Sequence, residues 1–204
     1  MKKIIILIIA MMLITPLAVQ AQMSASFQLA YNIHLSEYVT VTSPDIEESS
    51  GGIGFLLKGR YELNKQMALG FETGYLPWYS FSYETAAITT GYFTFPATKS
   101  ESSAYSIPLM GQFMYMLSEG DFVPRLEGAL GLQIVGATAS TTVGSTTTEV
   151  SSSSAYLAFG FGGGFDYNLS ENLFLDVALR LTIVLSSGSS TSMLTPAAGI
   201  GMKF

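Results

Sequence analysis

The residue types that could carry out chemistry are few in this chain. His34 is its single histidine, and it stands two residues before Ser36, with Glu37 next to that serine. Histidine, serine and a carboxylate are the groups of nucleophilic hydrolysis, in which the histidine activates the hydroxyl. The three residues lie at the end of the first predicted strand, and a polar histidine at the rim of the fold is the favoured interpretation.

Two further groups could bind ligands. Asp45, Glu47 and Glu48 could attract divalent cations, but their spacing is not specific and a solvated acidic loop is favoured. The run from Gly160 to Gly164 looks like a phosphate-binding loop, yet such loops precede a helix and no helical pattern follows. Glycines inside a strand more often make room for neighbouring side chains.

The elements that position these residues show a period of two. Phe27, Leu29 and Tyr31 alternate with small or polar residues, which is typical of a strand with two different faces. The same alternation predicts eight strands, at about 24–34, 52–63, 67–79, 103–117, 122–136, 154–167, 173–185 and 193–204. Their lengths suit tilted strands that cross a bilayer.

The connections between these segments alternate in length. Short turns are expected at 64–66, 118–121 and 168–172, and longer stretches at 35–51, 80–102, 137–153 and 186–192. Short periplasmic turns and long extracellular loops are the rhythm of outer-membrane barrels, so both termini are expected on the periplasmic side. The Ser/Thr-rich part of 137–153 is interpreted as a loop.

Volume decides which face points inward. The interior of an eight-stranded barrel is just wide enough for side chains to fill, so the large apolar set must face outward. The opposite face holds glycines, alanines and ten charges, which are expected to form a balanced interior network, because buried charges are costly unless paired. Its members are Lys58, Arg60, Arg125, Arg180 and Lys203 with Glu62, Glu72, Glu127, Asp166 and Asp176.

Turn positions predict the register of two hairpins. A pair between Leu63 and Met67 places Lys58 opposite Glu72. The same construction at 168–172 places Gly160 opposite Arg180 and Gly164 opposite Asp176.

The N-terminus reads as an export signal. Lys2 and Lys3 precede an apolar run of about eleven residues that ends before a small-residue cleavage site at Ala21. Residues 1–21 are therefore expected to be a cleaved signal peptide and 22–204 a single barrel domain. The chain is 49% hydrophobic, 12% charged and free of cysteine, so disulfides cannot stabilise it.

The C-terminal strand ends in alternating apolar residues, at Gly199, Ile200, Met202 and Phe204. This pattern resembles the signal by which outer-membrane barrels are recognised by the barrel assembly machinery. With the strand rhythm, the whole mature chain resembles the small outer-membrane β-barrel superfamily of OmpX, Ail and the OmpA membrane domain. The resemblance implies outer-membrane lipid and lipopolysaccharide as surroundings. No peptidoglycan-binding domain follows, so the cell-wall anchoring of full-length OmpA is not expected.

Within that superfamily, lipid A deacylases of the PagL type use a His-x-Ser pair late in the chain, whereas His34 lies on the first strand and faces inward. The chain is therefore expected not to be an enzyme and to need no metal or cofactor. With the signal removed the net charge is −6 − 2 = −8, which disfavours nucleic acid as a partner. The leading hypothesis is a structural or interaction barrel that binds an extracellular ligand through its loops; a narrow solute channel, a lipid A-modifying enzyme and a soluble periplasmic ligand-binding barrel are the alternatives.

Overall fold

The computed structural model describes residues 22–35, 46–186 and 189–204, with backbone alone at 46–50, 95 and 189. Every helix or strand assigned in these ranges is a β-strand, and no helix there is long and apolar enough to cross a membrane. The strands are β1 (Met23–His34), β2 (Ile46–Ser50), β3 (Gly52–Glu62), β4 (Met67–Thr85), β5 (Ile88–Thr90), β6 (Phe93–Phe95), β7 (Thr98–Met116), β8 (Phe122–Val143), β9 (Thr146–Asn168), β10 (Leu173–Ser186) and β11 (Ser189–Lys203).

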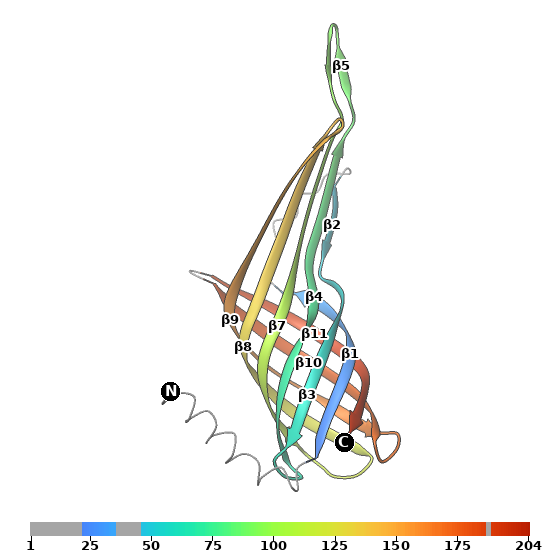
Figure 1. Ribbon diagram of the computed structural model, residues 1–204, viewed down its shortest axis with the longest axis vertical. Helices are drawn as coiled ribbons and strands as arrows, with labels where there is room; N and C mark the ends of the chain where they lie inside the picture. The colour runs from blue at the N-terminus through green and yellow to red at the C-terminus, as the bar shows by residue number, and fades with distance from the viewer. Residues whose placement is uncertain (1–21, 36–45, 187–188) are drawn as a thin grey trace, which may run out of the picture.

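Eight of the strands in the described ranges close into a ring. The order around it is β1, β3, β4, β7, β8, β9, β10 and β11, and β11 pairs with β1. All pairings are antiparallel, and each strand lies beside its neighbour in sequence, with β2 added along the far end of β4. Figure 1 shows the tilted strands wrapped around one axis. The predicted eight-stranded antiparallel up-and-down barrel is confirmed.

The first short turn fixes its hairpin as expected. The Leu63 amide donates to the Met67 carbonyl over 2.8 Å, and the Asn64 side chain accepts from the Gln66 and Met67 amides. Asparagine stabilises turns in this way. The ladder that follows pairs Lys58 with Glu72.

The register predicted for the hairpin at 168–172 is wrong by two residues. Arg180 lies opposite Gly162 rather than Gly160, and Asp176 lies opposite Asp166 rather than Gly164. The turn closes when the Leu169 and Ser170 amides donate to the Leu173 carbonyl. This centres the hairpin one residue later than the sequence suggested.

Several strands run far beyond the predicted ends. The expected loops at 80–102 and 137–153 are mostly paired strand: β4 continues to Thr85, β7 starts at Thr98, and β8 and β9 pair up to Val143 and Thr146. The β-branched threonines favour extended pairing, and Gly144, with a positive φ of 61°, permits the two-residue turn. The expected long connection at 186–192 is also wrong, because the ladder reaches Ser186 and Ser189.

The barrel wall is therefore uneven. Beyond the ring, β4, β7, β8 and β9 continue as one sheet on one side, and the β5–β6 hairpin stands above them (Figure 1). We call this extension the protruding sheet, made of residues 79–85, 98–104, 137–143 and 146–156. The other end of the barrel, with its three short turns, is called the turn end.

An irregularity in β4 marks where the protruding sheet begins. The ladder between β4 and β7 shifts between Pro77 and Tyr79, which leaves Trp78 as an extra residue. Its side chain packs inside the barrel against a buried apolar cluster with Met110, Val184 and Met193. A β-bulge of this kind reverses the side-chain alternation beyond it.

Candidate functional site: the charged interior and the protruding sheet

Inward-facing positions alternate with outward ones along every ring strand. Of the ten charged residues that the sequence assigned to the interior, eight are buried there: Lys58, Arg60, Arg125, Arg180, Glu72, Glu127, Asp166 and Asp176. Four are cationic and four anionic. Burial of an unpaired charge is strongly unfavourable, so their contacts decide whether the barrel is stable.

Glu72 is the centre of one group of contacts. The Arg180 guanidinium donates to both carboxylate oxygens, one of them over 2.7 Å. Gln112 donates to Glu72 over 2.8 Å, and the Lys58 ammonium lies 3.7 Å from it. The carboxylate is therefore enclosed by donors from β3, β7 and β10.

Arg125 is the centre of a second group. Its guanidinium donates to Asp166 and to Asp176, and its Nε lies 3.6 Å from Glu127. Arg60 also binds Asp166, and the Ser26 hydroxyl donates to Asp176 over 2.7 Å. With 1% of its surface exposed, Arg125 is among the most deeply buried residues described.

One contact joins the two groups. The Lys58 ammonium lies 3.7 Å from Glu127, so an unbroken chain of ion pairs runs from Arg180 to Arg60. Arg180 and Glu72 belong to strands four places apart in the ring of eight, as do Arg60 and Asp166. These pairs span the barrel from wall to wall, and the arrangement braces and fills the interior.

Two of the predicted residues lie at the edge of this network. Glu62 and Lys203 are half-buried at the turn end, where Lys203 donates to Asn168 over 2.8 Å. Ser26 and Gln112 were not among the predicted network residues, although both occupy inward positions by parity. Applying that parity to polar as well as charged residues would have found them.

Inward glycines provide the space for the largest interior groups. A Cβ at Gly201 would lie 2.1 Å from the Phe174 ring, and Arg60 lies over that ring at 5.5 Å from its centre. A Cβ at Gly162 would lie 2.2 Å from the Leu179 carbonyl oxygen. Glycine is thus required where an aromatic ring or a neighbouring strand comes close to the backbone.

Gly199, Ile200 and Met202 lie on β11 beside β1, and Phe204 follows the end of that strand, where its amide donates to the Met23 carbonyl. Ile200, Met202 and Phe204 point outward and are exposed, while a Cβ at Gly199 would meet the Phe27 carbonyl. Their expected role in recognition by the assembly machinery stays a prediction.

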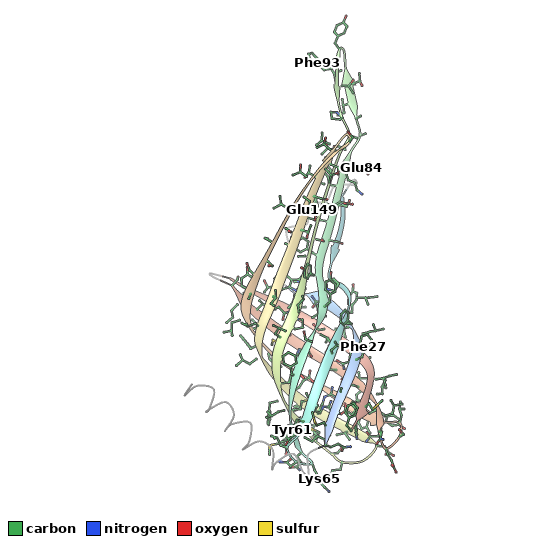
Figure 2. The ribbon with its side chains drawn as sticks, in the orientation of Figure 1. Phe27, Tyr61, Lys65, Glu84, Phe93 and Glu149 are labelled. Carbon is green, nitrogen blue, oxygen red and sulfur yellow. The ribbon has the colours of Figure 1, made fainter. Side chains whose placement is uncertain are left out.

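The outer face of the ring is covered with exposed large apolar side chains. Phe27 is one of those labelled in Figure 2, which shows side chains projecting outward around the barrel. A row of stacked rings crosses four neighbouring strands, from Phe27 to Phe55, Tyr75 and Tyr105. Such a surface is unsuited to water and suited to a hydrocarbon environment.

The other candidate sites predicted from the sequence do not form a catalytic or metal-binding centre among the described residues. His34 packs edge-on against Trp78 with ring centres 5.0 Å apart, whereas Ser36, Glu37 and Asp45 lie outside the described residues and Glu47 and Glu48 have only described backbone. The stretch from Gly160 to Gly164 is interior to β9. No group of three potential metal ligands occurs in the described part of the chain.

Among the described residues, the β9 side of the protruding sheet is an open edge. Within the described residues, β9 is paired with β10 as far as Leu157, whereas its pairing with β8 continues to Thr146. The Asn168 amide donates toward β8, to Asp121, and the register shows no shift from Tyr167 to Thr146. Alternate residues of an antiparallel strand bond to opposite sides, so the odd-numbered backbone groups face the open edge. In the described part of the chain these belong to Thr147, Glu149, Ser151 and Ser153.

Comparison with known proteins places the chain. Residues 7–204 match the outer membrane protein beta-barrel domain family. The crystal structure of Ail, the attachment invasion locus protein of Yersinia pestis, is similar, with a TM-score of 0.51, 17% identity, and 90% of this chain and 97% of that chain covered. The crystal structure of Neisserial surface protein A has a TM-score of 0.49 and 15% identity, with 90% of this chain and 97% of that chain covered. No curated protein matches by sequence. This chain belongs to the outer membrane protein beta-barrel domain family and is an integral protein of the bacterial outer membrane.

Proposed function

We propose that this protein is a surface interaction protein that offers the open β9 edge of its protruding sheet to an extended polypeptide. The observation that carries the proposal is the outer backbone edge of residues 146–153, which are paired with β8 on one side and with no strand of the described residues on the other. Proteins ordinarily protect such edges with prolines, bulges or charges. This one has a single charge, Glu149, and no proline or register shift.

The chemistry of the edge favours main-chain recognition. An added strand gains its affinity from backbone hydrogen bonds, and side-chain pockets add specificity. Serine, threonine and alanine dominate 146–156, so few side chains obstruct an incoming strand. Binding through this edge would therefore tolerate many partner sequences that adopt an extended conformation.

In the proposed orientation the short turns and both termini lie in the periplasm and the protruding sheet lies outside the cell. Long strands and connections on the extracellular side are the rule for outer-membrane barrels. Lipopolysaccharide would then surround the base of the sheet. The cleaved signal peptide at 1–21 lies outside the described residues and stays a prediction.

The filled interior favours this role over a narrow channel. A braced set of buried ion pairs between Lys58, Glu72, Arg125 and their partners occupies the space through which a solute would pass. The large apolar outer face disfavours a soluble periplasmic barrel. The expectation that the chain is not an enzyme stays a prediction.

The edge can be tested by panning phage-displayed random ten-residue peptides against the mature protein in nanodiscs. Peptides that bind should lose at least about tenfold in affinity toward the Ser151→Pro/Ser153→Pro variant, because proline removes two edge donors while the β8 ladder stays intact. The matched Ser151→Thr/Ser153→Thr variant keeps both donors and should bind normally. Equal binding to the proline variant would refute recognition through this edge.

A further inference from the structure

Of the described elements, the β5–β6 hairpin lies farthest from the barrel (Figure 1). It stands beyond the ends of β4 and β7, with Phe93 labelled near its tip (Figure 2). From Tyr75, in the row of outward aromatic rings, β4 runs ten more residues to Thr85, a rise of about 33 Å at roughly 3.3 Å per residue. The tip is therefore held far from the apolar wall of the barrel.

The hairpin has one apolar and one hydroxyl face. Thr89 and Thr94 pair across it with their hydroxyl oxygens 3.3 Å apart. Ile88 and Phe93 point to the opposite face and are 61% and 74% exposed. Tyr92, in the two-residue turn, is fully exposed. These side chains contribute little to the barrel's stability, and their exposure to water is unfavourable.

The tip also lacks charge. No acidic or basic residue occurs from Thr85 to Thr98, although Glu84 and Lys99 flank the stretch and the whole chain has a net charge of −6. An uncharged partner surface suits such a tip. An anionic partner surface would repel the rest of this protein, whose net charge is negative.

We propose that this hairpin is a lipid-contacting tip that places Tyr92 and Phe93 in the interface of an apposed, electrically neutral bilayer. Aromatic side chains favour the boundary between headgroups and acyl chains. A two-stranded hairpin keeps unpaired backbone groups on its outer edges, and these need water, so insertion is shallow. The threonine face stays toward the headgroups and water while Ile88 and Phe93 lie toward the hydrocarbon.

The hairpin tip and the β9 edge are distinct surfaces, and lipid contact by the tip requires only that the protruding sheet lies outside the cell. The two surfaces can act together, with the tip contacting a membrane while the edge holds a polypeptide. Variants at the β9 edge are expected to leave lipid contact unchanged.

Single cysteines give a direct test, because the chain has none of its own. The mature protein, embedded in nanodiscs, is labelled with an environment-sensitive dye at Thr90→Cys on the apolar face, or at Thr94→Cys on the hydroxyl face as the matched control. Added phosphatidylcholine vesicles should shift the emission to the blue at position 90 and leave position 94 nearly unchanged. Phosphatidylserine vesicles at low salt should give a weaker response.

Vesicle flotation of the unlabelled protein gives a second measurement. Tyr92→Ser and Phe93→Ser should each reduce the vesicle-bound fraction by about tenfold or more, as expected for loss of an aromatic ring from an apolar contact. Thr89→Ser and the Ser151→Pro/Ser153→Pro variant should float like the parent protein. Absence of flotation and of the blue shift would overturn the proposal, as would pairing of nanodiscs through their tips without vesicles.

Discussion

Arg180 and Glu72 meet across the full width of the barrel. They come from strands on opposite sides of the ring and are separated by 108 residues in sequence, yet two hydrogen bonds join their side chains in the buried interior. A contact of this kind can form only when the ring has closed, so it reports on the completed fold.

Removing one partner of this pair should strongly destabilise the barrel. Arg180→Met leaves the buried Glu72 carboxylate with only Lys58 and Gln112 as partners. Glu72→Gln leaves the Arg180 guanidinium buried without its anionic partner. Each change should lower the free energy of unfolding by about 3–5 kcal/mol. The double variant should lose much less than the sum, because neither charge is left uncompensated.

Urea unfolding in phospholipid vesicles, followed by the fluorescence of Trp78, the chain's single tryptophan, measures these effects. Lys65→Gln is the control, since the Lys65–Glu119 pair is exposed and should contribute less than about 1 kcal/mol. Additive losses in the double variant would show that the two charges do not depend on each other.

Glycines on the two faces of the wall should respond oppositely to substitution. Gly201→Val places side-chain atoms in the space of the buried Phe174 ring and should reduce the yield of folded barrel severely. Gly59→Ala adds a methyl group that meets nothing within 4 Å, and it should leave stability unchanged or raise it by about 0.4–1 kcal/mol.

The yield of heat-modifiable protein on SDS gels after refolding measures both substitutions. Adding Phe174→Leu to the Gly201 variant should recover part of the yield by vacating ring space. A Gly201→Val protein that folds as well as the parent would contradict the packing described for this position.

The proposed orientation predicts which residues are reachable from outside the cell. Thr147, on the protruding sheet, and Glu119, at the turn end, are both exposed. A membrane-impermeant maleimide should label Thr147→Cys on intact cells and Glu119→Cys only after lysis. The reverse labelling pattern would place the termini outside the cell.

Local patterns predicted much of this fold because strand geometry is local. Successive side chains alternate between faces wherever a strand forms, so parity alone assigned Lys58 and Arg125 to the interior. Asn64 supplied the turn chemistry that set the first hairpin register. The hairpin at 168–172 lacked an equally decisive signal, and its register was wrong.

The predictions failed where structure depends on pairing between segments. Ser/Thr-rich sequence from 137 to 153 looks like a loop when read alone, but β8 and β9 supply each other with backbone partners and remain paired to the turn. The bulge at Trp78 likewise depends on the fit of β4 against β7; Pro77 marks a possible irregularity in the sequence, but it does not say which residue is left over.

The sequence by itself determined which side chains share a face, the balance of interior charge and the outward placement of large apolar residues. Tertiary structure alone decided which charges meet, such as Arg60 with Asp166 and Arg180 with Glu72. Ring closure and strand tilt bring these residues together. Both depend on the registers of all eight strand pairs in the ring, which no single segment of sequence specifies. The open β9 edge has the same origin, because it exists only where β10 ends before β9 does.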